Sequence, residues 1–346
     1  MNTRALHFWN AGTETPSQAF ANDQLAMLIA ALRGHAVARL WRASDAGLSL
    51  GRYHRRDSAR DIGTNGLVRR LCGGRIVPQG PGIACLTLAV PQVAWLDPRL
   101  GTLRPEQVLN RSLRPLLAAL RSAAVDAFYP GRDLVTVSGR TLAHAAFTVA
   151  RDGALLVQMQ IADSDGFDAL PRLLERFDPA GVAAVDRNAF DGAATFVELT
   201  GRTLDDAGFE EGLAAALGSQ LRCEVFRGEP CDSGDATRAD EDTFTMFQQE
   251  PGPLPEGSTI ASAISMLGVV ELAARMENGH LHGVRVTGDL IAPFHVIDRL
   301  EDGLEGQPAQ LPILRRAVAR VLSQPGSFVL GMRDLDAVLA RLVPQD

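Results

Sequence analysis

The sequence predicts an α+β protein with mixed and antiparallel sheets, helices packed on the outside, and a small α/β unit at the C-terminal end. Three observations support this prediction. Apolar or alternating runs come in neighbouring pairs joined by short glycine turns, as in strand hairpins. Helical stretches separate these pairs and do not alternate with single strands, so a doubly wound parallel sheet is not expected. The length of 346 residues favours two domains.

The first third of the chain predicts one helix and several strands. Residues 17–32 place apolar side chains at helical spacing, and Gly34 follows them as a C-terminal cap. The segment therefore predicts an opening helix packed on a sheet. Strands are expected at 36–41, 47–53 and 89–96, and a hairpin around a double glycine is expected at 69–88.

The middle of the chain predicts helices around a second group of strands. Five leucines share one face of residues 105–127, which predicts an amphipathic helix. A helix is expected at 168–177, with Asp168 as its cap, and another at 203–217, with Asp205 and Asp206 in its first turn. Strands are expected at 134–137, 145–149 and 154–161, and 195–199 completes this part of the chain.

An acidic, turn-rich segment divides the sequence. Residues 223–257 predict a linker or surface excursion between one domain at residues 1–222 and another at residues 258–346. In the second domain Glu277-Asn278-Gly279 lies between apolar runs and predicts a hairpin. Further apolar runs at 260–267, 269–276, 284–286 and 294–304, with helices at 311–322 and 332–342, complete a compact unit.

Composition excludes several classes of function. The net charge of −7 argues against a protein that wraps nucleic acid. No apolar run is long enough to cross a bilayer and the N-terminus lacks the apolar core of a signal peptide, so a cytoplasmic protein without a membrane partner is expected. Cys72, Cys85, Cys223 and Cys231 have no metal-binding spacing, so we expect free thiols and no metal site.

The stretch 69–88 carries the strongest chemical signal. Gly73 and Gly74 lack a Cβ, so the backbone there can approach another group closely and present its amides. Arg69, Arg70 and Arg75 surround these glycines with planar charged groups that suit phosphate or carboxylate. The residues predict an anion-binding loop, although a solvated hairpin would show the same pattern.

This stretch, RRLCGGRIVPQGPGIACLTL, resembles the RRxSGGGAVFHDxGNxxxxF signature of the lipoate–protein ligase and octanoyltransferase family. Cys72 takes the place of the usual serine, and Arg75 that of the third glycine. Residues 38–56, 126–146 and 268–290 resemble, in order, the family's "slGryQ" strands, its "Dl..ngrKiaGsa" strand and its accessory domain. The resemblance implies a class II synthetase-like, biotin/lipoate ligase fold of the two-domain type.

The resemblance also implies a reaction, in which lipoate or octanoate is activated with ATP and Mg²⁺ and passed to a lysine of a lipoyl-carrier domain. The family lysine that neutralises the phosphate is replaced here by Thr141, and the glycine after it by His144. Arg140 or Arg75 would have to replace that cation. Tyr129 stands where octanoyltransferases carry a nucleophilic cysteine.

The acyl/adenylate pocket that the resemblance implies has a defined set of residues. Asp133 is expected on its magnesium or adenine side, Gln158 and Met159 beneath the ligand, and His54 near it. Cys72 remains a candidate nucleophile, because neighbouring arginines lower the pKa of a thiol, but its position in a hairpin favours a small half-buried structural cysteine. The expected binding residues are Arg70, Cys72, Gly73, Gly74, Gly82, Asp133 and Gln158.

All 34 positively charged residues are arginine, so no lysine of this chain can act in catalysis. An arginine bias of a GC-rich genome would explain this composition. A protein that handles an activated acyl group also gains by having no surface amine to acylate.

Two functions stay open from the sequence. The first is an ATP-dependent lipoate or medium-chain acyl ligase in which an arginine replaces the lysine. The second is an inactive homologue that binds lipoate or a lipoylated carrier protein as an accessory or assembly factor. Arginines facing an open cleft would favour the ligase, whereas a cleft filled by Tyr129, His144 or Met159 would favour the binding protein. A biotin ligase is less expected, because the chain lacks a GRGRxG-like biotin loop.

Overall fold

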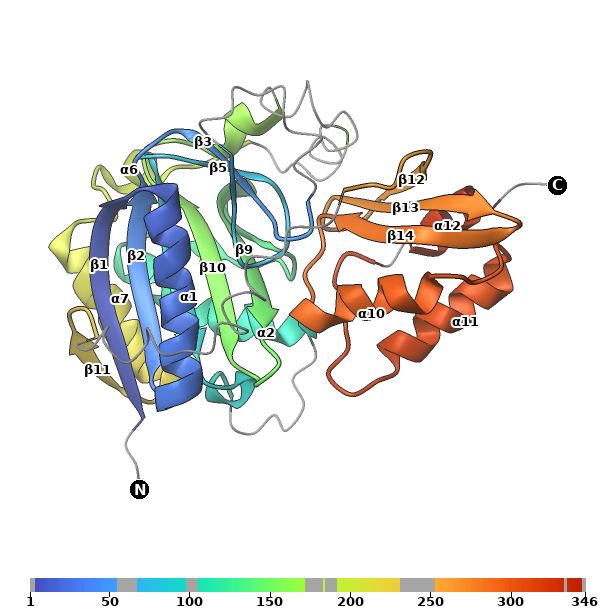
Figure 1. Cartoon of the computed structure of the whole chain (residues 1–346). Helices are drawn as coiled ribbons and strands as arrows, with labels where there is room; N and C mark the ends of the chain where they lie inside the picture. The colour runs from blue at the N-terminus through green and yellow to red at the C-terminus, as the bar shows by residue number, and fades with distance from the viewer. Residues whose placement is uncertain are drawn as a thin grey trace.

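The computed structural model describes residues 4–54, 67–97, 105–171, 183, 192–230, 253–332 and 335–343. A large unit extends to residue 230, and a C-terminal unit begins at residue 253 (Figure 1). The large unit contains an eight-stranded sheet in the order β11-β1-β2-β6-β10-β9-β8-β7 and a three-stranded sheet in the order β4-β3-β5. This architecture confirms the predicted α+β class.

The eight-stranded sheet is mixed. β1 runs parallel to both of its neighbours, β11 and β2, and every other pair is antiparallel. The expected strand at 89–96 is wrong, because the strand ends at Val90, before Pro91, which cannot donate a ladder hydrogen bond. In sheet order the strands are β11 (Glu224–Arg227), β1 (Ala5–Glu14), β2 (Ala36–Ala43), β6 (Ile83–Val90), β10 (Leu155–Ala162), β9 (Arg140–Val149), β8 (Leu134–Val137) and β7 (Ala127–Phe128).

The three-stranded sheet corrects the expected hairpin at 69–88. β3 (Gly47–Leu50) pairs in parallel with β4 (Leu67–Arg69) and antiparallel with β5 (Val77–Gln79), so β4 and β5 lie on opposite sides of β3. Residues 70–76 are too long for a tight turn and cross the end of β3 instead, where the Arg52 amide donates to the Cys72 carbonyl.

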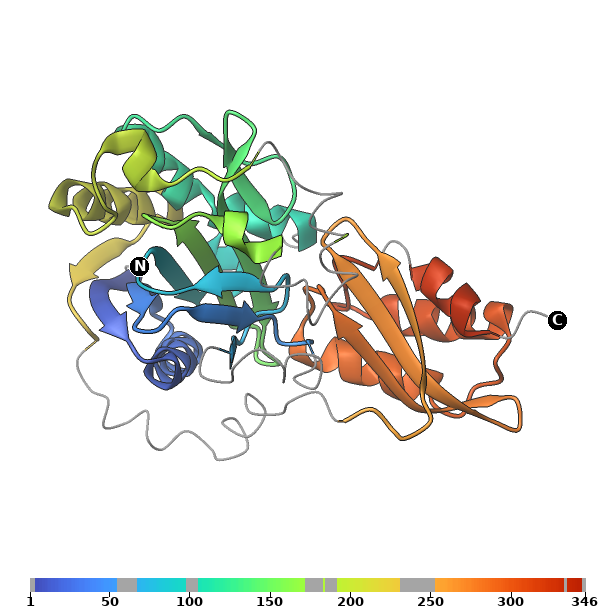
Figure 2. The ribbon, with the colours of Figure 1, turned by 90° about the horizontal axis from the view of Figure 1, so that it is seen from above.

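Helices cover both faces of the eight-stranded sheet (Figures 1 and 2). α1 (Pro16–Arg33) lies on one face, begins with a capping box and ends at Gly34. α3 (Arg114–Ser122), α6 (Phe196–Thr200) and α7 (Ala207–Leu221) belong to the other side. The single helix expected at 105–127 is two, α2 (Pro105–Ser112) and α3, because Pro115 interrupts the helical hydrogen bonds.

The C-terminal unit is an antiparallel sheet with helices on one face (Figure 2). The predicted hairpin is confirmed: Asn278 and Gly279, with φ of 50° and 77°, form the turn that joins β13 to β14. Its strands are β12 (Thr259–Ile264), β13 (Val269–Glu277) and β14 (His280–Gly288), and its helices are α10 (Phe294–Leu304), α11 (Leu311–Leu322) and α12 (Leu335–Leu342).

The expected domain boundary and one expected helix lie next to parts of the chain that the structure does not describe. β11 lies within the segment 223–257 but pairs with β1, so the large unit extends past the expected boundary at residue 222. Residues 231–252 of that segment lie outside the described residues, as does 172–177 of the helix expected at 168–177. In the parts of the chain that the structure covers, no helix is long and apolar enough to cross a membrane.

The two units share a packed junction. The main core of the large unit includes Leu267, Ile291 and Phe294 from the C-terminal segment. Tyr53 of the large unit belongs to the core of the C-terminal unit, and its hydroxyl donates to the Ala292 carbonyl at 3.1 Å. The glycine-rich stretch that the sequence singles out lies at this junction.

Candidate functional site

The glycine loop, residues 70–75, approaches protein backbone. A Cβ on Gly73 would lie 1.9 Å from the Leu290 carbonyl oxygen, and the Gly74 amide donates to that oxygen at 2.6 Å. Gly74 has a φ of 82°, which favours glycine. Gly51 completes the packing, because a Cβ there would lie 2.1 Å from the Gly74 oxygen. The close approach predicted from the glycines is therefore a contact between the two units.

Arg70 holds the shape of this loop. Its guanidinium is buried and donates to the carbonyl oxygens of Gly73, Ser49 and Arg75. Burial lowers the pKa of Arg70 to about 10, which leaves the side chain charged near neutral pH. All three guanidinium nitrogens therefore bond to main chain, and Arg70 supports the loop instead of presenting a free group to an anion.

Arg75 and Asp133 form a buried pair. Nε and Nη2 of Arg75 donate to the two oxygens of Asp133, the second at 3.1 Å. Nη2 also donates to the Met266 carbonyl of the C-terminal unit at 3.1 Å. Burial lowers the pKa of Arg75, but Asp133 outweighs it and holds the pKa above its usual value. Arg75 is thus a permanent cation, tied to a carboxylate and to the junction.

Arg140 and Thr141 lie elsewhere, at the start of β9. Arg140 is partly exposed and pairs with Glu198 at 2.7 Å. The Thr141 backbone bonds to Gly192 and Ala194. The backbone carbonyl of Asp133 accepts from the Ala145 amide. Ala145 lies five residues beyond Arg140 on β9, so about 16 Å of strand separates Arg140 from the position of Asp133. The structure does not bring Arg140 and Arg75 together.

Cys72 is an inert core residue. It is fully buried, its amide donates to Oε1 of Gln158 at 3.2 Å, and its thiol contacts the Leu156 carbonyl. Burial raises the pKa of the Cys72 thiol well above its usual value, and this effect outweighs the opposing charge of Arg70. The expectation that arginines activate Cys72 is wrong, because desolvation of the thiolate dominates.

Gln158 and Met159 cannot both lie beneath a ligand. Neighbouring residues of a strand point to opposite faces. Gln158 faces Cys72 and donates to Asp23 of α1 at 2.5 Å, whereas Met159 belongs to the main apolar core. Gly82 lies at another position, the β5–β6 turn, where its carbonyl accepts from the amides of residues 163–165.

A buried ionic network lies between α1 and the sheet, and no pattern in the sequence indicated it. Arg39 of β2 is fully buried and pairs with both Asp23 and Glu14. Burial raises the pKa of Asp23 to about 6, although Arg39 opposes the shift. Through Asp23 and Gln158 this network reaches the Cys72 amide, so it supports the glycine loop from below.

Next to this network is the polar row, which we define as Trp41, Cys85, Gln160 and His144. The strand registers place these four residues side by side on β2, β6, β10 and β9. His144 packs edge-on against Phe167 with ring centroids 4.6 Å apart. Burial lowers the pKa of His144 to about 3, so the imidazole is neutral near neutral pH.

The polar row is only partly hydrogen-bonded, since Nε1 of Trp41 donates to Oγ1 of Thr87 at 3.1 Å but its other members have few partners. Within the described residues Nδ1 of His144 has none, and Gln160 has a single weak contact, to the Cys85 sulfur at 4.0 Å. Nε2 of Gln79, on β5, is also unsatisfied there. Unpaired buried polar groups cost about 1–3 kcal/mol each, so a polar ligand at this row would satisfy them. The signal available in the sequence was the polar residues at alternate positions of apolar strands.

His54 also lies at the junction of the two units, where it contacts Asp289 of the C-terminal unit. Its Nε2 lies 2.9 Å from Oδ1 of Asp289, and Oδ2 of Asp289 accepts from the Val269 amide at 2.6 Å. Burial would raise the pKa of Asp289, but His54 holds it below its usual value. His54 therefore joins the two units.

Magnesium does not fit the residue expected to bind it. Both oxygens of Asp133 bond to Arg75, so a metal ion there would have to displace a buried arginine. Across the described parts of the chain, no group of three or more His, Cys, Asp or Glu side chains is placed to hold a metal. We therefore assign no step to magnesium.

Comparison with known proteins identifies the fold. No protein-family model matches the sequence, and a search of characterised proteins finds no match. Among solved structures, LipL1 of P. falciparum, determined in complex with lipoate, has a TM-score of 0.66 at 15% identity. The alignment covers 99% of this chain and 100% of LipL1.

Two further solved structures have a similar fold. A bipartite lipoate protein ligase from Thermoplasma acidophilum, reported with its E2 lipoyl domain, has a TM-score of 0.51 at 14% identity, covering 72% of this chain and 93% of that one. Lipoate-protein ligase A bound with ATP has a TM-score of 0.51 at 12% identity, covering 72% and 95%. This chain therefore has the lipoate–protein ligase fold, as the resemblance in its sequence predicted.

Proposed function

We propose that this chain is a lipoate–protein ligase-like enzyme, which activates lipoate or octanoate with ATP and transfers the acyl group to a lysine of a lipoyl-carrier domain. The observation that carries the proposal is the fold match to LipL1, solved with lipoate, along the whole of both chains. The unpaired Nδ1 of His144 and the weakly bonded amide of Gln160 in the polar row support it from within the structure.

In this proposal the polar row receives the acyl carboxylate. The Gln160 amide donates to an oxygen of the carboxylate or of the adenylate phosphate. The neutral imidazole of His144 supplies one further hydrogen bond, and the indole of Trp41 and the thiol of Cys85 form an uncharged wall beside it. Each of these groups is held by a strand of the sheet, so the ligand would meet a preorganised surface.

Arg75 is the cation that takes the place of the missing lysine. His144 pairs in the sheet with Leu134, the residue that follows Asp133, so the Arg75–Asp133 pair lies near the His144 end of the polar row. Arg70 is engaged by carbonyl oxygens, and Arg140 lies at the far end of β9. Arg75 can therefore stabilise charge that develops on the phosphate, through water-excluded electrostatics.

Pyrophosphate release with lipoate and Mg-ATP tests the first half-reaction. Arg75→Gln combined with Asp133→Asn should lower the rate by about 10²–10³, as expected for loss of one charge-stabilising group. The double variant replaces both charges by a neutral pair, so no unpaired charge is left in the core. Arg140→Gln should change the rate by less than about twofold. Acylation of a purified lipoyl-carrier domain, followed by mass spectrometry, tests the second half-reaction.

A second function, lipoate binding without activation, is favoured by one observation. Asp133 already neutralises Arg75, and Met266 occupies a further donor of its guanidinium. If the pair stays closed when ATP is present, the protein would bind an acyl group as an accessory to a carrier protein. Calorimetric binding of lipoate together with the absence of pyrophosphate would support this function and contradict the ligase.

A further inference from the structure

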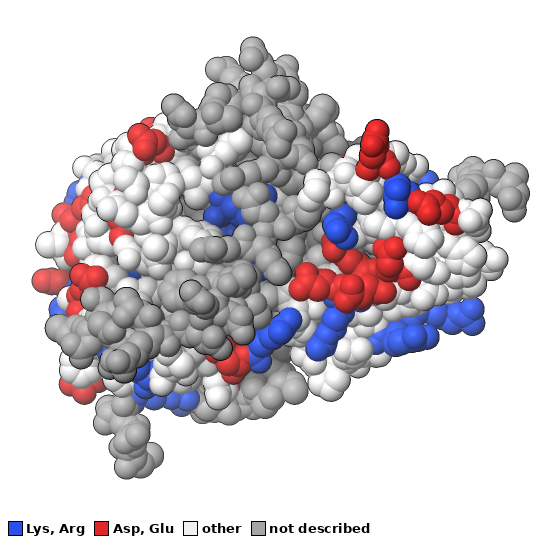
Figure 3. Space-filling view, in the orientation of Figure 1, with Lys and Arg blue, Asp and Glu red and all other residues white. Residues whose placement is uncertain are grey.

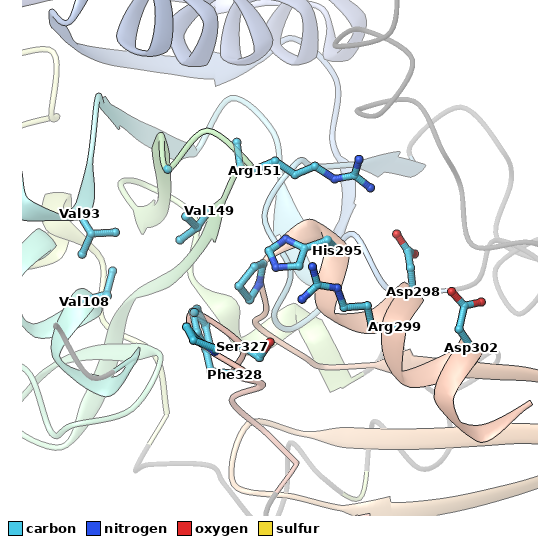
Figure 4. A pocket seen from close by; sticks show the side chains of 15 residues that line it. Val93, Val108, Val149, Arg151, His295, Asp298, Arg299, Asp302, Ser327 and Phe328 are labelled. Carbon is cyan, nitrogen blue, oxygen red and sulfur yellow. The ribbon is translucent and has the colours of Figure 1, made fainter. Parts of the chain in front are cut away.

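A cavity of about 840 Å³ lies at the junction of the two units, away from the polar row (Figure 4). The large unit contributes Val93, Val108 and the β9–β10 turn, and the C-terminal unit contributes the start of α10 and residues 325–328. Its volume is in the range of sites that hold small molecules. The lining residue Val149 lies five residues along β9 from His144 of the polar row, which is about 16 Å of strand.

The cavity is apolar at one end and charged at the other. Val93, Val108 and Val149 line one side, and Phe328 closes it by packing on Phe147 at 5.6 Å between ring centroids. Arg151, His295 and Arg299 line the opposite side (Figure 4). A ligand that fills the cavity would therefore have an apolar chain and a polar head.

The charge at the polar end is positive where it meets the apolar wall. Neither Arg151 nor Arg299 pairs with a carboxylate in the described part of the chain, and Arg299 bonds only to the neutral amide of Gln324. Burial and then the charges of Arg299 and Arg151 lower the pKa of His295, and Asp298 opposes them less strongly. Arg151 and Arg299 thus contribute two positive charges close to His295.

The acidic residues of the lining belong to the outer surface. Figure 4 shows Asp298 and Asp302 on the side of α10 away from the valines, whereas Arg299 points back toward His295. Figure 3 shows the acidic side chains over α10 as a patch on the outside of the C-terminal unit, with arginines at its border toward the large unit.

Polar atoms of the lining are also unsatisfied. Within the described residues neither the Ser327 hydroxyl nor Nδ1 of His295 has a hydrogen-bond partner. Ser327 lies beside Phe328, and His295 lies beside Arg299 (Figure 4). Oxygens of a bound head group would offset the cost of leaving such groups unpaired.

From this arrangement we infer that the junction cavity is a binding site for a medium-chain carboxylate, with its chain against the valines and Phe328 and its head group at Arg299 and Arg151. The site is separate from the polar row and does not depend on the proposed ligase activity. Because both units line it, the bound molecule would hold them together and stabilise the junction.

Methyl NMR of the full-length protein with labelled valines tests the inference, with octanoate as the probe. Octanoate should shift the signals of Val93, Val108 and Val149 in a saturable manner. Arg151→Gln combined with Arg299→Gln should weaken binding at these signals by at least about tenfold, the loss expected for charge-assisted hydrogen bonds. Both arginines are exposed, so the double variant should fold normally.

Two controls make the experiment decisive. Arg316→Gln, at an exposed position of α11, should leave octanoate binding unchanged. Octanol has the chain without the charge and should bind at least about tenfold more weakly. Absence of shifts at the three valines, equal binding of octanol, or unchanged binding by the double arginine variant would each overturn the inference.

Discussion

At the scale of single residues, Asp133 and Glu198 show how burial decides the importance of an ion pair. Asp133 is buried with Arg75, whereas Glu198 is about half exposed. Asp133→Asn leaves a buried cation without its partner and should lower the free energy of unfolding by about 3–5 kcal/mol. Glu198→Gln should lower it by no more than about 1 kcal/mol. Urea denaturation of both variants measures the difference, and equal losses would contradict the buried pair.

His144 should make stability depend on pH. Its folded pKa is about 3 and its ordinary value is 6.5, so the unfolded chain takes up a proton first as pH falls. The native state therefore loses stability between pH 6.5 and 3, by an amount on the order of a few kcal/mol. Asp23 acts in the opposite direction, because its raised pKa means that stability is lost as pH rises from 3.8 to about 6.

A difference measurement isolates His144 from Asp23. His144→Gln cannot take up the proton, so its free energy of unfolding should fall less than that of the wild type between pH 6.5 and 4. Denaturant titrations at several pH values give both curves. Parallel curves would mean that His144 is already protonated or accessible to water in the native state.

At the scale of elements, the glycine loop is the contact that joins the two units. Gly73→Ala would place a methyl group within 1.9 Å of the Leu290 oxygen, so the loop and the residues after β14 must separate. We expect a loss of about 1–3 kcal/mol and faster proteolysis at the junction. Gly303→Ala, within α10, should be neutral or stabilising, because alanine favours a helix and the nearest atom is a side-chain methyl. Equal effects of the two substitutions would contradict the assigned contact.

The elements also show which features sequence can predict. α11 has the predicted bounds, and the Asn278-Gly279 turn is where it was expected, because periodicity and turn chemistry are local properties. The sheet β4-β3-β5 could not be predicted in the same way, since it depends on which strand lies beside β3.

The residues of the site were harder to predict for the same reason. Gly73 and Gly74 indicated a close approach, but Leu290 is far away in the sequence. Arg75 indicated a site for a bound anion, but the anion that it contacts in the structure is the carboxylate of Asp133. The polar row is assembled from four strands, so its members become neighbours only when the registers are known.

At the scale of the whole molecule, we expect the two units to unfold together. The main core takes residues from both units, and buried contacts at Arg75 and His54 cross the junction. All three tryptophans, Trp9, Trp41 and Trp95, lie in the large unit, so their fluorescence reports on that unit alone. Fluorescence and far-ultraviolet circular dichroism should give coincident urea transitions. Two separate transitions would show that the units are independent.

Calorimetry with a non-hydrolysable lipoyl-adenylate analogue tests most directly whether the polar row binds the activated acyl group, as we propose. The wild-type protein should bind the analogue with one-to-one stoichiometry. Gln160→Leu, which keeps the apolar bulk and removes the amide, should weaken binding by about tenfold. No binding by the wild type, or equal binding by the variant, would contradict the claim.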